Sequence, residues 1–294
     1  MPTACVWCGA PLSQGKRLKG RVRCASCGVA TTSPWPTQAE LERAYGGWYR
    51  PPGGRFSGVG DLLLRRARGA LAGRLERIAP AGPILDVGAG DGALVEGLRR
   101  RGREATGLDS DADGPHVRRG SLASEEEGAW AAVVFWHSLE HLPEPAEALV
   151  EARRLLVPGG VVVIAVPNSD SLQARLFGDS WLALDPPRHL VHLTGRALRD
   201  RLRDLGFEVE RVSYLRGGQV VFGWLHGLVG LLPGKPSLYD AIRRREARSA
   251  ALSPARRAAI VAAAVVLLPF ALGAAAFEVA LRRGGTVYAE ARHR

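Results

Sequence analysis

The feature that most constrains the fold is the stretch Ile84-Leu-Asp-Val-Gly-Ala-Gly-Asp-Gly92. A short apolar strand runs into glycines at every second position, and a helical pattern begins at Ala93. Such a turn leaves no room for side chains, so a ligand can lie against its backbone and the following helix N-terminus. The G-x-G-x-G spacing differs from the G-x-G-x-x-G of dinucleotide sites. The backbone positions expected to contact a cofactor are Gly88, Ala89, Gly90 and Gly92.

Two acidic residues at strand ends indicate the kind of cofactor. Asp86 would repel a pyrophosphate, but it suits the cationic amino group and sulfonium of S-adenosylmethionine. Asp109 ends the next predicted strand, in Gly107-Leu-Asp-Ser110, where a carboxylate can accept both hydroxyls of a ribose. A tight turn beside a surface aspartate is the alternative, and it explains the whole arrangement less well. We predict S-adenosylmethionine as the cofactor, with Asp86, Asp109 and Ser110 among its contacts.

Strands and helices alternate after Pro83, as in a parallel sheet with βαβ crossovers. The predicted strands are 84–87, 105–108, 116–119, 132–136, 161–166 and 207–213, and 286–291 alternates as a closing strand. The predicted helices are 61–78, 93–101, 145–156 and 195–205. Thr194 is the expected N-cap of the last of these helices.

An ordered series of motifs resembles the class I S-adenosylmethionine-dependent methyltransferases. It comprises 84–92, 107–109, Trp136-His-Ser-Leu-Glu-His-Leu142, Arg154-Leu-Leu-Val-Pro-Gly-Gly160, Val166-Pro-Asn168, Pro187-Arg-His-Leu190 and Gly206-Phe207. The series is most similar to a bacterial small-molecule branch related to the ubiquinone-type O-methyltransferases.

The resemblance implies an α/β fold, with a seven-stranded, mostly parallel sheet and helices on both faces. The last strand then inserts antiparallel between the fifth and sixth strands. The resemblance also implies an adenine contact after the third strand. Many relatives carry an aspartate there, whereas this chain offers only Ser121.

One candidate histidine, His137, follows the fourth predicted strand, and another, His189, lies on the loop before the helix that Thr194 caps. Ligands bind beyond the carboxyl ends of strands in open α/β sheets, and His137 and His189 both map there. Methyl transfer to a hydroxyl needs alignment and a base for the acceptor proton, a role that suits histidine. We prefer His189 as the base because its loop should face the acceptor, with His137 as the second candidate and a cofactor contact. The alternative is that these histidines only brace the loop beside the cofactor.

Four cysteines form two closely spaced pairs. Cys5-x-x-Cys8 and Cys24-x-x-Cys27 are separated by 15 residues, which is the spacing of two zinc knuckles that close one tetrahedral site. Disulfides are the alternative, and a reducing compartment disfavours them. All four ligands come from protein, so we predict a structural Zn²⁺ in an N-terminal zinc ribbon. Whether the ribbon recognises RNA or protein, or only caps the catalytic domain, stays open.

Two apolar segments, 220–232 and 258–277, precede the closing strand. The second is a twenty-residue uncharged run flanked by arginine pairs, long enough to span a bilayer. A single crossing would place the closing strand across the membrane from the sixth, and 220–232 is too short for a hairpin. We therefore expect a hydrophobic insertion that contacts the membrane interface or lines an apolar acceptor pocket. Simple packing on the protein is the alternative.

The sequence divides into four regions. We predict a ribbon over 1–34, a connector and leading helix over 35–80, a methyltransferase domain over 81–213 and 285–294, and the insertion over 214–284. The formal net charge is +11, and nearly all of the positively charged residues are arginines scattered along the chain. This charge therefore gives little reason to expect binding to nucleic acid. The N-terminus lacks a basic region followed by an apolar run. We expect a cytoplasmic protein, peripheral to the inner face of the membrane.

We predict methyl transfer to a small-molecule acceptor, lipid-like or quinone-like, at oxygen. The alternative is an RNA methyltransferase that uses the ribbon to recognise its substrate. The apolar insertion and the Pro187-Arg-His189 segment favour the first function, and the intact glycine loop argues against a non-catalytic binding module. The sequence leaves the acceptor's identity and the oligomeric state open.

Overall fold

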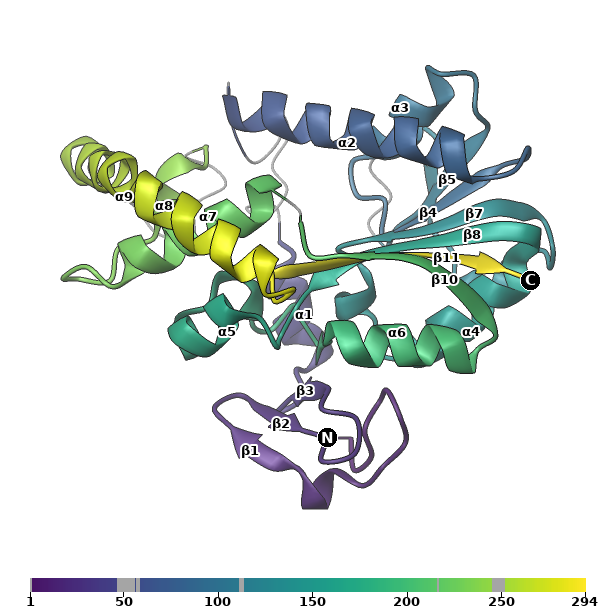
Figure 1. The fold of residues 1–294 in the computed structure, drawn as a ribbon, viewed down its shortest axis with the longest axis horizontal. Coiled ribbons are helices and arrows are strands. Elements are labelled where there is room, and N and C mark those ends of the chain that lie inside the picture. Colours follow the sequence, from purple (N-terminus) through teal and green to yellow (C-terminus); the bar gives the residue numbers. More distant parts are fainter. Residues whose placement is uncertain (1, 47–55, 57–58, 111–113, 216, 245–251) are drawn as a thin grey trace.

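A computed structural model describes residues 2–46, 56, 59–110, 114–215, 217–244 and 252–294. Its centre is a seven-stranded sheet in the order β10-β11-β8-β7-β4-β5-β6 (Figure 1). The strands are β4 (Ile84–Val87), β5 (Ala105–Leu108), β6 (Val117–Arg118), β7 (Trp130–Trp136), β8 (Leu156–Pro167), β10 (Phe207–Ser213) and β11 (Thr286–His293). Strands β4 to β8 pair in parallel, and β11 is antiparallel to both β8 and β10. The predicted insertion of the last strand between the fifth and sixth is confirmed.

Helices cover both faces of the sheet. Helices α2 (Val59–Ile78) and α3 (Ala93–Arg99) lie on one face, and α4 (Pro145–Leu155) and α6 (Gly195–Asp204) lie on the other (Figure 1). Along β8, side chains alternate between the two cores: 161, 163 and 165 face α2 and α3, while 162, 164 and 166 face the opposite side. Because both faces are buried, the strand is a continuous apolar run. Thr194 caps α6 as predicted, accepting from the amide of Ala197 at 3.1 Å.

Strand β8 begins five residues before the predicted strand. Leu156 already pairs with Trp130, and the register then shifts before Ala132. Gly159, within the intervening segment, has a φ of +77°. The extra length is therefore an irregular strand entry, which a count of alternating apolar residues does not detect.

An ion pair with a buried carboxylate holds α2 against the last strand. The guanidinium of Arg74 donates two hydrogen bonds to Glu290, at 2.9 and 2.6 Å, and the hydroxyl of Tyr288 donates a third. Glu290 is fully buried in β11, so its charge requires these partners. The ion pair joins α2 to the last strand, and Arg68 on the same helix lines a pocket with Gly88 and Ala89 of the glycine loop.

The N-terminal ribbon, residues 2–34, is joined to the main domain. Its strands β1 (Lys16–Leu18), β2 (Arg21–Arg23) and β3 (Ala30–Thr32) form one sheet with β9 (Val191–His192), which lies just before α6. Side chains of the ribbon belong to the same hydrophobic core as β7 and β8: Cys5, Trp7, Leu12, Val22, Cys24 and Val29. Helix α1 (Gln38–Ala44) follows, with Thr37 and Glu40 forming a capping box.

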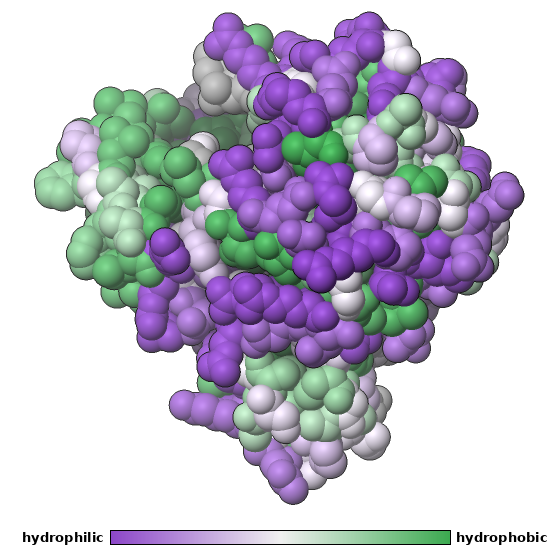
Figure 2. Space-filling model, turned by 45° about the vertical axis from the view of Figure 1, so that its right-hand side comes forward, coloured by the Kyte–Doolittle hydropathy of each residue, from purple (hydrophilic) through white to green (hydrophobic). Residues whose placement is uncertain are grey.

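In the described part of the segment between β10 and β11, three helices project from one side of the molecule (Figure 1). They are α7 (Gly217–Gly230), α8 (Leu238–Ile242) and α9 (Pro254–Ala280). Among the described residues, α9 is the one helix long and apolar enough to cross a bilayer, yet only 22% of its most apolar window is buried. Figure 2 shows hydrophobic surface gathered over this lobe. Its exposed side chains include Val261, Val265, Val266, Phe270, Leu272 and Phe277.

Candidate active site

The glycine loop between β4 and α3 has the backbone that its sequence predicts. Gly88, Gly90 and Gly92 adopt φ values of +77°, +61° and +70°, a region that residues with side chains avoid. Space is limited as well, because a Cβ on Gly88 would lie 2.4 Å from the Cβ of Ser138. The amide of Gly90 donates to Oδ2 of Asp109 at 2.7 Å. The carboxylate that ends β5 is thereby fixed against the loop.

A small pocket opens at the carboxyl ends of β4 and β7. It is lined by Arg68, Leu71, Asp86, Gly88, Ala89, Leu94 and Trp136. Asp86 is buried, and burial raises the pKa of its carboxyl to about 7, with Asp109 and Asp91 adding to the rise and Arg68 opposing it. A carboxyl in this state gains most from a cationic ligand, whose charge replaces the missing solvation.

Sequence reasoning missed two residues of this pocket. Arg68 reaches it from α2 and pairs with Asp91 at 3.2 Å, and Trp136 closes it from the end of β7. Helical periodicity gave no signal for Arg68, because the face that overlies the loop is set by tertiary packing. Trp136 lies in the quoted histidine motif and could have been found as the strand end beside Asp86.

The other expected cofactor contacts lie nearer the surface. Ser110 is exposed directly after Asp109, and the next three residues lie outside the described part of the chain. Ser121 is exposed and precedes the short helical turn η2 (Leu122–Ser124).

His137 lies between a carboxylate and an amide. It follows β7 with a φ of +53°, and its backbone amide donates to the carbonyl of Ala165 at 2.8 Å. Nε2 of His137 is 2.8 Å from the side-chain nitrogen of Gln219, and Nδ1 is 3.5 Å from Oε1 of Glu140. An amide nitrogen donates, so Nε2 accepts and the proton of the neutral ring lies on Nδ1, facing Glu140. This arrangement leaves the basic lone pair directed away from the carboxylate.

Glu140 is the buried centre of this site. It lies in the turn η3 (Leu139–His141) and is 1% exposed. Burial alone would raise the pKa of its carboxyl, but His137, His141 and His189 outweigh burial and lower that pKa to about 2. Glu140, His141 and His189 offer donor atoms that all lie within 4.8 Å of one another. The carboxylate can therefore share a proton or a cation with its histidine neighbours.

His189 is more enclosed than His137. Its Nδ1 donates to the carbonyl of Ala183 at 2.8 Å, and its Nε2 lies 3.7 Å from Asp185 and 3.9 Å from Glu140. The side chain is 10% exposed, against 24% for His137. The structure thus brings the two predicted histidines within 4 Å of the same carboxylate oxygen, Oε1 of Glu140.

The loop that carries His189 is fixed by contacts with distant segments. Arg188 forms an ion pair with Asp185 and donates to the carbonyl of Ala44 at 3.1 Å. Nδ1 of His141 is 2.9 Å from the carbonyl of Arg188 and 2.8 Å from the hydroxyl of Tyr45. Burial lowers the pKa of His141 to about 4, with the charge of His189 adding to the fall, so His141 is neutral near pH 7.

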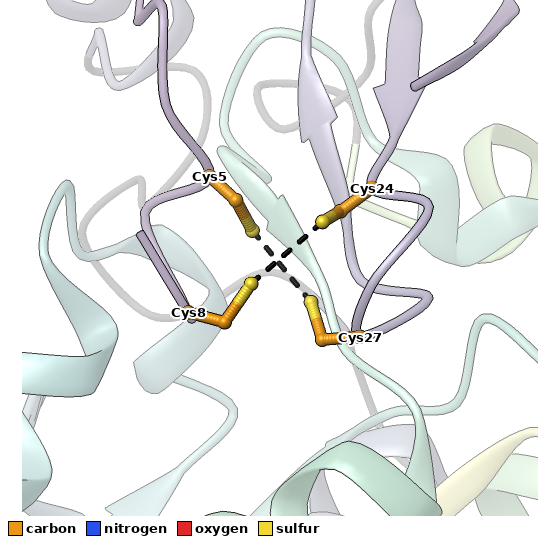
Figure 3. Close-up of side chains that lie close together, drawn as sticks. All are labelled: Cys5, Cys8, Cys24 and Cys27. Carbon is orange, nitrogen blue, oxygen red and sulfur yellow. Dashed lines mark hydrogen bonds between the residues drawn. The ribbon is translucent and has the colours of Figure 1, made fainter. Parts of the chain in front are cut away.

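The four cysteines lie together in the ribbon, and their sulfurs point toward one another (Figure 3). The Cys5–Cys27 and Cys8–Cys24 sulfur distances are both 3.7 Å. The two halves are alike, because Gly9 and Gly28 each have a φ of +74° and donate to the carbonyls of Cys5 and Cys24. Four thiolates at 2.3 Å from one tetrahedral metal would be separated by about 3.8 Å. The sulfur arrangement therefore fits a single tetrahedral ion.

The sheet order, the antiparallel last strand and the glycine loop beside a buried acid define a class I methyltransferase domain. The chain belongs to the methyltransferase family whose model is described as "Methyltransferase domain". That model matches residues 63–212, slightly more than half of the chain.

Known proteins resemble parts of the chain. A ubiquinone biosynthesis O-methyltransferase of Alkalilimnicola ehrlichii is 37% identical over 102 residues, covering 29% of this chain and 41% of that protein. A protein of the same name from Methylococcus capsulatus is 29% identical over 174 residues, covering 52% of this chain and 68% of that protein. The chain thus spans between 41% and 68% of these relatives. A solved S-adenosylmethionine-dependent methyltransferase of Archaeoglobus fulgidus aligns at 19% identity and a TM-score of 0.48, covering 80% of this chain and 100% of that one.

Proposed function

We propose that the protein transfers a methyl group from S-adenosylmethionine to the hydroxyl of a small, apolar acceptor. The observation that carries this proposal is the position of His137. It directly follows Trp136, which lines the cofactor pocket, and its basic nitrogen faces α7 of the apolar lobe. The relatives' name, ubiquinone biosynthesis O-methyltransferase, supports an acceptor that is quinone-like or lipid-like.

The residues around the pocket suit the charges of the cofactor. Asp86 would hold the amino group, and Arg68 would hold the carboxylate, which is the cofactor's one anionic group. The backbone of the glycine loop, at Gly88, Ala89, Gly90 and Gly92, would lie in contact with the cofactor. Asp109 and Ser110 would hold the ribose, and Ser121 the adenine. When bound, the cofactor supplies a methyl group activated by a positively charged sulfur.

Between the two histidines expected from sequence, the geometry supports His137 better as the base. Glu140 faces Nδ1, so it orients the ring and stabilises the charge that the ring gains with the acceptor's proton. The Nε2 of His189 instead faces two carboxylates inside the loop. We propose that His189 maintains Glu140 in its ionised form, and that His137 receives the proton.

Gln219 indicates where the acceptor binds. Its side-chain amide donates to Nε2 of His137, as a hydroxyl about to lose its proton would. Gln219 lies in the first turn of α7, whose Val220 and Trp224 are buried in the apolar lobe. We propose that the acceptor hydroxyl replaces the Gln219 amide and that the apolar part of the acceptor lies toward α7.

We further propose that Cys5, Cys8, Cys24 and Cys27 hold one structural Zn²⁺. The matched sulfur distances and the two knuckle turns support this assignment. With four protein ligands the ion would have no open coordination position, so its contribution would be to stability and not to chemistry.

The lobe of α7, α8 and α9 is our proposed membrane contact. Val266 and Phe270 are one helical turn apart on α9 and are 70% and 69% exposed. Arg256 and Arg257 lie near the start of the helix, and Arg282 and Arg283 follow its end, where they can meet anionic headgroups. We propose that α9 lies in the interface, which makes the protein a cytoplasmic enzyme peripheral to the inner face of the membrane.

A kinetic comparison of two variants tests the proposed function. The acceptor would be a hydroquinone with an alkyl chain, presented in detergent micelles with radiolabelled S-adenosylmethionine. We expect His137→Ala to lower kcat by about 10²- to 10⁴-fold while cofactor affinity stays within about threefold of wild type. His189→Ala should retain more activity than His137→Ala. Equal turnover in His137→Ala and wild type would contradict the assignment.

A further inference from the structure

The N-terminal ribbon and the loop that carries His189 are joined by backbone hydrogen bonds. Strand β9 extends the ribbon sheet, with Ala30 opposite His192 and Thr31 opposite Val191. The amide of Thr32 also donates to the carbonyl of Leu190 at 2.9 Å. Three consecutive residues of the loop are therefore held in register by β3.

The side chain of Thr32 adds two further bonds to the same loop. Its hydroxyl donates to the backbone carbonyl of His189 at 2.7 Å and lies 3.2 Å from Nε2 of His192. Because the hydroxyl hydrogen is used toward His189, the ring nitrogen of His192 donates to Thr32. Burial lowers the pKa of His192 to about 3, with the charge of His189 adding to the fall. His192 is therefore a neutral donor across the physiological range.

We propose that Thr32 is a positioning residue through which the ribbon sets the place of His189. Thr32 fixes the backbone of His189, and the Ala183 carbonyl fixes its ring at Nδ1, so Nε2 is directed at Glu140 and Asp185. The proposal rests on the proposed function, in which the 185–192 loop is part of the active site. The ribbon then supports catalysis through the placement of this loop.

The neighbouring residue provides a matched control. Thr31 lies on the same strand and is 1% exposed, and within the described part of the chain its hydroxyl has no hydrogen-bond partner. Replacing Thr31 by valine removes no bond, whereas the same change at Thr32 removes two. Thr32→Ser keeps the hydroxyl and serves as the conservative variant.

The kinetic experiment uses the full-length, zinc-loaded protein with the alkyl hydroquinone as acceptor. We expect Thr32→Val to lower kcat by about 10- to 100-fold, because small misplacements of catalytic groups have effects of this size. Zinc content and the Kd of S-adenosylmethionine should stay within about twofold of wild type. Thr31→Val and Thr32→Ser should resemble wild type. A kcat of Thr32→Val that matches that of Thr31→Val would overturn the proposal.

Amide hydrogen exchange tests the same coupling without turnover. In Thr32→Val, the 186–193 segment should exchange at least about tenfold faster than in Thr31→Val, while β4 and β5 keep their wild-type rates. If neither the wild type nor any variant methylated the hydroquinone, the proposed function would fail. The exchange rates would still show whether Thr32 holds the loop in place. Equal exchange of 186–193 in the two valine variants would show that Thr32 does not hold the loop.

Discussion

Asp86 is the single residue whose charge bears most directly on cofactor binding. It lies in a strand whose neighbours are apolar, and its burial raises the pKa of the carboxyl to about 7. A cationic ligand therefore meets a carboxyl group that is partly protonated near neutral pH. Cofactor binding and proton release are linked at this residue.

We predict that S-adenosylmethionine binds more tightly as the pH rises from 5.5 to 7.0. Over this range Asp86 ionises while the amino group of the cofactor stays protonated, so the Kd should fall by about tenfold. Isothermal titration calorimetry at fixed ionic strength measures this change. Asp86→Asn should bind weakly and with little pH dependence. If the Kd of Asp86→Asn changed with pH as strongly as that of wild type, a group other than Asp86 would be responsible for the pH dependence.

Glu278 joins the helices that surround it. This residue near the end of α9 is fully buried, and its carboxylate accepts from the amide and side chain of Gln173 and from the indole of Trp224, all at 2.9 Å. The three donors come from α5 (Leu172–Phe177) and α7. The carboxylate thereby holds the C-terminal end of α9 on the protein.

We expect Glu278→Leu to lower the free energy of unfolding by about 3 kcal/mol or more, because it leaves buried donors without an acceptor. Urea denaturation followed by circular dichroism measures the loss. Glu147→Leu, on an exposed position of α4, is the matched control and should change stability by less than about 0.5 kcal/mol. Equal stabilities of the two variants would mean that Glu278 is not an anchor.

The outer face of α9 has a different role from its buried end. We predict that the protein sediments with vesicles that contain anionic phospholipid, and that the double variant Val266→Asp, Phe270→Asp does not. Both side chains are exposed, so the substitutions should leave the fold intact. The double variant Leu62→Asp, Leu64→Asp places the same two charges on exposed positions of α2 and should bind like wild type. Binding that survives the double variant would rule out this face as the membrane contact.

At the scale of the whole molecule, the ribbon and the catalytic sheet share one hydrophobic core. Cys5, Trp7 and Cys24 pack in the same cluster as residues of β7, β8 and α6. The N-terminal segment also reaches the active-site loop through Ala44 and Tyr45. Destabilising the ribbon should therefore lower the stability of the whole chain.

We predict about one zinc ion per chain by metal analysis, and its loss in Cys24→Ser. Calorimetry should show a single unfolding transition in wild type, and in Cys24→Ser a melting temperature about 10 °C lower. A shared core cannot lose one part without weakening the other. Two separate transitions, with only the smaller one affected by the substitution, would indicate an independent ribbon.

Much of the fold could be predicted because buried parallel strands are apolar runs bounded by glycine and proline. The glycine loop, Asp86 and the cysteine pairs were likewise visible in sequence, since each depends on residues close together in the chain. The pairing of Thr32 with His189 and the contact of Gln219 with His137 were not. Both join residues more than eighty positions apart, and local patterns carry no signal of such contacts.

The most direct test of the account follows the methyl group itself. The full-length protein would be incubated with S-adenosylmethionine carrying a radiolabelled methyl group and with a cell extract, which is then separated into lipid, small-molecule, RNA and protein fractions. We predict that label enters the lipid or small-molecule fraction with wild type and not with His137→Ala. Label found mainly in RNA would contradict an apolar small-molecule acceptor.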